Sequence, residues 1–264
     1  YALANRYDDA RAAMAHAEAM LLARAKDTPA ANVASLVSRI QRAFMVGDGE
    51  LGAALARQLL ALSHEMHDAN MEQEAQLSIA QAYDIEQDFP RMIDENLALL
   101  ALLDKAPDGG APDMRAAADE ALGRAYNALA RYPEAIEPLR KAVELYAKAG
   151  DPDGRAVAVI AMCDALVATG KAHDARELLE PLLHELHEGT DVRPQRIGSA
   201  ELALARALWD DGDARDRDRA KALAADAKRD YTTAIANMQK IMPVVVPRLQ
   251  AKLSAIEAWQ NKHE

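Results

Sequence analysis

Apolar residues recur at intervals of three and four along most of this chain. Between residues 120 and 146 one such stripe consists of Leu122, Ala125, Tyr126 and Leu129. A second stripe follows a tight turn near Tyr132-Pro133 and consists of Ala135, Leu139, Ala142, Val143 and Tyr146. This spacing is typical of amphipathic helices. The segment is therefore predicted to be two helices joined by a turn.

Small residues stand inside both predicted helices. Gly123 costs a helix about 1 kcal/mol relative to alanine. Its benefit is close approach, since a neighbouring helix can pack against backbone where no side chain intervenes. Ala135 and Ala142 offer the same close approach from the second helix.

The same arrangement repeats along the chain. The first small position of each second helix is assigned to Ala10, Ala53, Met92, Ala135, Ala175 and Ala220. Successive positions are 39 to 45 residues apart. A fixed period of this length is the signature of a repeat protein, in which each unit buries its apolar face only by stacking on its neighbours.

Gly, Asp and Pro turns divide the repeats into helix pairs. The pairs are expected at residues 30–68, 72–105, 114–149, 154–188 and 195–232. Residues 1–27 match only the second half of a unit, so we expect a partial repeat there and part of one more repeat upstream. Residues 247–262 are apolar on one side and are expected to form a capping helix, which shields the last face of a solenoid. Residues 1–264 are expected to form a single superhelical domain.

The order and spacing of seven residues resemble the tetratricopeptide repeat, or TPR: Leu122, Gly123, Tyr126, Tyr132, Ala135, Leu139 and Ala142. HEAT-type repeats have a similar period, but the Gly-Tyr-Ala-Ala pattern favours TPR. The resemblance implies an all-α fold, a right-handed TPR-like α-solenoid of antiparallel helix pairs with a C-terminal capping helix.

A narrower resemblance covers the last quarter of the chain. Residues 201–231 (ELALARALWDDGDARDRDRAKALAADAKRDY) and the final helix are similar to the C-terminal TPR regions of large bacterial serine/threonine kinases and related multidomain regulators. The sequence has no kinase Gly-rich loop, HRD or DFG motif. The resemblance therefore implies a bacterial signalling protein in which this region contacts its own catalytic domain or tethers substrates.

The charge balance narrows the choice of partner. The net charge is −11 and only 4% of residues are aromatic. This combination argues against a nucleic-acid binder and against an anionic membrane surface. No stretch of about 20 apolar residues is present to span a bilayer. Cys163 is the one cysteine, so no intrachain disulfide can form, and a reducing cytoplasmic setting is expected.

Two histidine pairs are the sharpest enzyme-like feature. His64 and His67, and likewise His184 and His187, are three residues apart and share a helix face. Zinc proteases of the HExxH type need a spacing of four. A solvated helix end, where the macrodipole favours histidine, is the preferred interpretation, and a metal site is the alternative.

Other reactive-looking residues are assigned structural roles. Cys163 occupies the repeat position of Gly123 and is expected to pack between helices. Residues 215–219 alternate in charge and are expected to be a solvated loop leading into a helix. We expect no catalytic residue, no cofactor and no metal.

The TPR resemblance also implies where a ligand lies. In that family the first helix of each pair lines a concave groove, and the residue after the Gly position projects into it. Here that column is Arg42, Gln81, Arg124, Asp164 and Arg206. Three residues further on, the second column includes Asp84, Asn127 and Trp209. The arginines suggest a locally cationic strip that suits carboxylates. The alternatives are that Arg124 pairs with Glu120 and that Trp209 belongs to the core between helices.

The sequence therefore predicts a non-catalytic protein–protein interaction scaffold that binds a protein or peptide segment, expected to be acidic, in its groove. One alternative is the regulatory or substrate-tethering module of a bacterial serine/threonine kinase. Another is self-assembly, in which the partner is a second copy of the chain.

Overall fold

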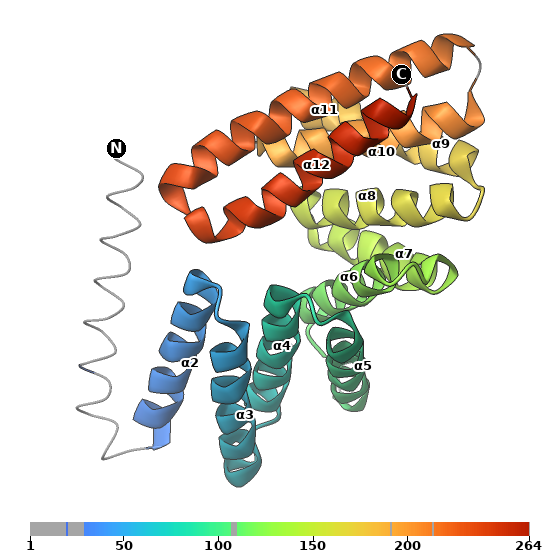
Figure 1. Cartoon of the computed structure of the whole chain (residues 1–264). Coiled ribbons are helices and arrows are strands. Elements are labelled where there is room, and N and C mark those ends of the chain that lie inside the picture. The colour runs from blue at the N-terminus through green and yellow to red at the C-terminus, as the bar shows by residue number, and fades with distance from the viewer. Residues whose placement is uncertain (1–19, 21–28, 107–109, 191, 213, 264) are drawn as a thin grey trace. The chain divides into compact units, whose positions relative to one another are not determined.

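The computed structural model describes Met20 and residues 29–106, 110–190, 192–212 and 214–263. Within these residues the secondary structure consists of α-helices and one 3-10 turn, without strands (Figure 1). The all-α class predicted from the hydrophobic pattern is confirmed. The chain divides into two compact units, Tyr1–Ala125 and Tyr126–Glu264, which are described separately.

The first unit contains helices that pack on one another in chain order. They are α2 (Pro29–Val46), α3 (Gly49–Met66), α4 (Ala69–Glu86), α5 (Phe89–Lys105) and most of α6 (Pro112–Ala128). One part of the core joins Leu99 and Leu103 of α5 to Ala118 of α6, and all three are fully buried. The expected partial repeat at residues 1–27 lies outside the described residues, apart from Met20.

The second unit begins at Tyr126, near the end of α6. Its helices are α7 (Tyr132–Ala149), α8 (Pro152–Ala168), α9 (Ala172–Glu188), α10 (Pro194–Asp211), α11 (Ala214–Ile241) and α12 (Val246–His263). Apolar residues from α7 to α11 form one continuous core, with Leu139, Leu179 and Leu204 fully buried. The expected single domain over residues 1–264 stays a prediction.

The column of small positions that defined the repeats is buried. Ala53, Met92, Ala135, Ala175 and Ala220 are each no more than 3% exposed. Ala10, the first member of the column, lies outside the described residues. Close packing at the start of each described second helix is thus common to the repeats, as the spacing indicated.

Most helix pairs are joined by the same short turn. A left-handed residue follows one helix, and the next residue is the N-cap of the following helix. The left-handed residues are Gly47, His67, Gln87, Ala130, Gly150 and Gly170. Four of the next residues are aspartates whose carboxylates accept hydrogen bonds from the first turn of the new helix: Asp48, Asp68, Asp88 and Asp151. A left-handed end and an aspartate cap satisfy backbone groups that helix ends otherwise leave unpaired.

The last helices differ from the expected boundaries. α11 runs to Ile241, nine residues past the expected end of its pair at residue 232, because no Gly or Pro interrupts it before Pro243. The β-branched residues that follow form a 3-10 turn, Pro243–Val245, rather than extended chain. α12 then packs Ile256, which is fully buried, against Leu202 of α10 and against α11. Among the described helices, none is both long and apolar enough to cross a membrane.

Candidate functional site

The first helices carry the predicted groove residues, and the structure gives two of their arginines acidic neighbours. In the first unit Arg124 Nη2 of α6 lies 3.4 Å from Asp84 Oδ2 of α4. Arg124 Nε also lies 3.0 Å from Glu120 Oε1, one turn earlier on its own helix. Burial works to lower the pKa of Arg124, but the attraction of Asp84 and Glu120 outweighs burial and raises that pKa above its ordinary value. The ion pair with Glu120 that the sequence allows is therefore formed.

The second unit repeats this arrangement. Arg206 Nη1 of α10 lies 3.1 Å from Asp164 Oδ1 of α8, and each side chain is 34% exposed. On α6, Asn127 Nδ2 donates a 2.7 Å hydrogen bond to the carbonyl oxygen of Ala161 in α8. Asp84 and Asn127 both belong to the second column, and both form contacts between neighbouring first helices.

Trp209 packs against the C-terminal helix. Its ring meets Trp259 edge-on, with centroids 5.7 Å apart, and lies 4.4 Å from the ring of His263. The guanidinium of Arg217 and the ammonium of Lys221, both on α11, lie 5.5 and 6.0 Å from the indole centroid. Trp209 is thus part of the packing between α10, α11 and α12, which was the alternative that its sequence position left open.

The remaining two groove candidates lie in the first unit. Arg42 is half-buried on α2, and Gln81 is exposed on α4. Since Arg124 and Arg206 each face an aspartate, the first-helix face carries both signs of charge. A guanidinium has five N–H donors, so each of these arginines retains donors for a further carboxylate.

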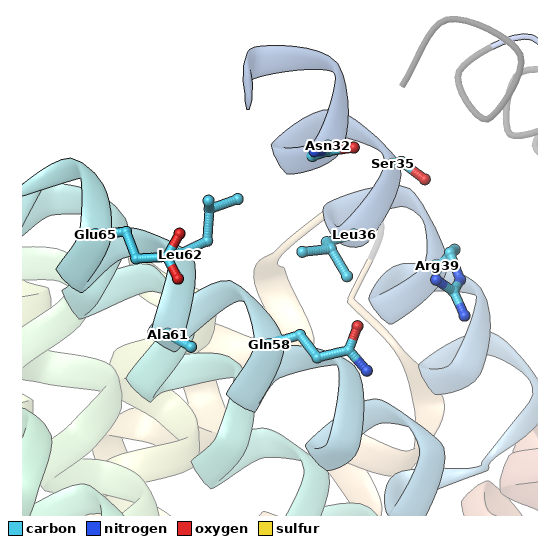
Figure 2. Close-up of a pocket in the computed structure, with 8 residues that line it drawn as sticks. All are labelled: Asn32, Ser35, Leu36, Arg39, Gln58, Ala61, Leu62 and Glu65. Carbon is cyan, nitrogen blue, oxygen red and sulfur yellow. The ribbon is translucent and has the colours of Figure 1, made fainter. Parts of the chain in front are cut away.

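Two hollows in the first unit were not predicted. One, of about 420 Å³, lies between α2 and α3 (Figure 2). Each helix contributes a stripe at helical spacing, namely Asn32, Ser35, Leu36 and Arg39 from α2 and Gln58, Ala61, Leu62 and Glu65 from α3. The other, of about 740 Å³, lies where α4, α5 and the start of α6 meet. None of the predicted groove residues lines either hollow.

The histidine pairs do not converge on a shared centre. His64 Nε2 lies 3.2 Å from Glu72 Oε1, and His184 Nε2 lies 3.3 Å from Glu188 Oε1. His67 is the left-handed residue that ends α3. In the described part of the chain no three His, Cys, Asp or Glu side chains are grouped in a way that could hold a metal ion.

Cys163 is fully buried, as its repeat position predicted. Its Sγ lies 3.7 Å from the carbonyl oxygen of Ala175, and burial raises the pKa of the thiol far above its ordinary value. A thiol in this state is a poor nucleophile.

The prediction for the alternating charges of residues 215–219 was wrong. These residues lie within the first turns of α11 rather than in a loop. Asp216 accepts from Arg176 at 3.0 Å, and Arg219 lies 2.8 Å from Glu180, so the run pairs with the preceding second helix, α9. An acidic residue in a first turn is also favoured by the helix dipole.

A buried carboxyl group was missed by the sequence reasoning. Glu201 of α10 is only 3% exposed, and His187 of α9 lies 3.6 Å from it. The sequence did indicate that Glu201 is buried, because residues 200–208 are almost entirely apolar and a helix with this sequence has almost no solvated face.

The stacked helix pairs and their buried column of small residues define a class of fold, the TPR-like α-solenoid. Solved structures of this class match the chain. A Podosopora anserina putative kinesin light chain with nearly identical TPR-like repeats matches with a TM-score of 0.58 and 20% identity, over 78% of this chain and 98% of that one. BtubC (BKLC) from P. vanneervenii matches with a TM-score of 0.51 and 16% identity, over 84% and 92%.

A third structure is a Rap protein complexed with Competence and Sporulation Factor. It matches with a TM-score of 0.58 and 15% identity, over 90% of this chain and 67% of that one. No protein-family model matches the sequence, and no curated protein is significantly similar to it. At these identities the likeness concerns the fold.

Proposed function

We propose that this protein is a non-catalytic scaffold that binds a segment of a partner protein along its first helices. The observation that carries the proposal is the repeated helix pair itself, in a stack of the same class as the Rap protein that is complexed with Competence and Sporulation Factor. Such a stack presents a row of equivalent side chains on successive helices, which suits an extended segment.

The preferred segment in this proposal is acidic. Arg124 and Arg206 use only part of their guanidinium donors on Asp84 and Asp164, and both remain more than a third exposed. A bidentate carboxylate contact is the strongest recognition that such an arginine offers. Asp84 and Asp164 limit the excess of positive charge, so a segment that also carries lysine or arginine is not repelled.

A peptide array tests the proposal. In this experiment the triple charge reversal R42E/R124E/R206E is expected to weaken binding of acidic peptides at least about tenfold, because each lost charged contact is worth roughly 1.5–3 kcal/mol. Arg140→Glu is the matched control, since Arg140 is an exposed arginine on the second helix α7, paired with Glu137. Circular dichroism establishes that each variant is folded.

Exchanging the two charges of the Asp164–Arg206 pair distinguishes an effect on peptide binding from an effect on protein stability. The double variant D164R/R206D keeps an ion pair between α8 and α10 but reverses its order. We expect wild-type stability with weakened binding of acidic peptides. Wild-type binding by both the triple reversal and the swap would contradict the first-helix site.

Two narrower proposals, a kinase regulatory region and self-assembly, have their own tests. If this is the regulatory region of a bacterial serine/threonine kinase, as the resemblance of residues 201–231 suggests, the same reading frame encodes a kinase domain. If the partner is a second copy, light scattering shows a mass that rises with concentration. In a cell, the scaffold proposal places the protein in the cytoplasm.

A further inference from the structure

Glu201 of α10 is a buried acid with an incomplete set of partners. Its Oε1 atom lies 3.6 Å from Nε2 of His187, in the last turn of α9. Its Oε2 atom is buried and has no hydrogen-bond partner. A buried carboxylate oxygen without a donor is costly when it is charged, and that cost is much smaller when the group is neutral.

A second acid faces the same side of α10. Asp230 of α11 packs over Gly198, where an added Cβ would lie 3.2 Å from the Asp230 Cβ atom. Gly198 and Glu201 are three residues apart on α10 and so share a helix face. Arg229, the cation adjacent to Asp230, pairs with Asp226.

Charged side chains on α8 and α12, the other helices packed nearby, form ion pairs of their own. From α8, Asp153 pairs with Arg196 and Asp164 pairs with Arg206, both on α10. From α12, Glu257 pairs with Lys228 of α11 at 2.9 Å. The charged and titratable groups that act on Glu201 are therefore Asp230, the half-exposed imidazole of His187, and Arg229.

Burial raises the pKa of Glu201 to about 7, and the charge of Asp230 adds to this increase while Arg229 opposes it. Burial also raises the pKa of Asp230, against the attraction of Arg229 and His187. Two acids that share a site cannot both ionise without cost, so the protonated form of one is favoured.

We propose that Glu201, His187 and Asp230 form a proton-binding switch that couples the packing of α10 against α9 and α11 to pH near neutrality. With Glu201 neutral, its hydroxyl is a hydrogen-bond donor and the buried site carries one negative charge fewer. With Glu201 ionised, the site holds a carboxylate without a donor on Oε2, and the packing of the three helices loosens. The switch concerns the stability of the second unit and does not depend on any partner.

The direction of the pH effect follows from proton linkage. Because the folded protein holds the Glu201 proton to a higher pH than the unfolded chain does, the free energy of unfolding falls as the pH rises from about 4.5 to about 7. Above that window the loss is complete.

Thermal unfolding of wild type and Glu201→Gln at a series of pH values tests the switch. Glutamine resembles the neutral acid, so the two Tm values should agree at pH 5. At pH 8.5 the variant should melt at least about 4 °C higher. The matched control is Glu188→Gln, which changes an exposed glutamate that also faces a histidine, His184, at the end of α9. Its Tm difference from wild type should not change with pH.

A second variant and a local measurement complete the test. Asp230→Asn removes the facing charge and should weaken the pH dependence of Tm, because burial of Glu201 remains while the repulsion from Asp230 is lost. Hydrogen exchange of wild type should show less protection in α9, α10 and α11 at pH 8.5 than at pH 5, after correction for the intrinsic rate. The proposal is overturned if both variants keep the wild-type pH dependence, or if protection in these helices does not change.

Discussion

At the scale of single residues, the turns between helices require a residue in the left-handed backbone conformation. Among the described residues, three that are not glycine adopt positive φ angles at helix ends: His67, Gln87 and Ala130, with φ values of 54°, 56° and 57°. An L-residue pays about 1–2 kcal/mol for the left-handed conformation, which glycine adopts freely. At equivalent turns the chain uses Gly47, Gly150 and Gly170.

We expect Ala130→Gly to raise the free energy of unfolding by about 0.5–1 kcal/mol, since it relieves the left-handed strain at a small cost in chain entropy. Urea denaturation measures the change. The control is Ala147→Gly, at an exposed helical position in α7, which should lower stability by about 1 kcal/mol. Equal destabilisation by both changes would contradict the strain argument.

At the scale of the elements, the helix starts and the ion pairs between repeats reflect the period. In the described part of the chain, five ion pairs join corresponding helices of successive repeats and span 39 to 43 residues: Asp84–Arg124, Asp164–Arg206, Arg176–Asp216, Glu180–Arg219 and Asp153–Arg196. This span lies within the 39 to 45 residues of the repeat period read from the sequence. Ion pairs therefore add to apolar packing between the repeats of α4 and α6, and between the repeat of α8 and α9 and that of α10 and α11.

Asp151 makes a clear test of the turn between α7 and α8. Its Oδ1 accepts a 2.9 Å hydrogen bond from the backbone N–H of Gly154. Asp151→Ala should lower the free energy of unfolding by about 1 kcal/mol. Asp210, an exposed acid in the last turn of α10, is the control, since an acid there opposes the helix dipole and Asp210→Ala should not destabilise. If Asp151→Ala and Asp210→Ala have the same free energy of unfolding, the Asp151 cap does not stabilise the protein.

At the scale of the whole molecule, stability comes from contacts between neighbours in the chain. Within each unit, helices contact those adjacent in sequence, and α8 also contacts α10. Proteins of this kind can lose structure locally, because no single core holds all repeats together.

Large-to-small changes in the two units test this property. Leu99 in the first unit and Leu204 in the second are fully buried, and replacing either by alanine should cost about 2–5 kcal/mol. Hydrogen exchange should show that Leu204→Ala exposes α8 to α11 more than α2 to α5, and that Leu99→Ala does the reverse. Uniform loss of protection in both variants would mean that the chain unfolds as one cooperative body.

The sequence by itself determined the helices, the period and the buried small positions. Helical periodicity and the Gly, Asp and Pro turns act over a few residues, so they can be read before any folding. Ala135 and Cys163 were placed in the core for the same reason, because a repeat fixes the environment of equivalent positions.

Only the tertiary structure decided which side chains meet. That Arg206 faces Asp164, that Trp209 meets Trp259 edge-on, and that Glu201 is left with an unpaired oxygen all depend on how far one helix is rotated and shifted against the next. A rotation by one residue changes a solvated face into a contact, and the energies that choose between such arrangements are summed over many weak contacts far apart in sequence.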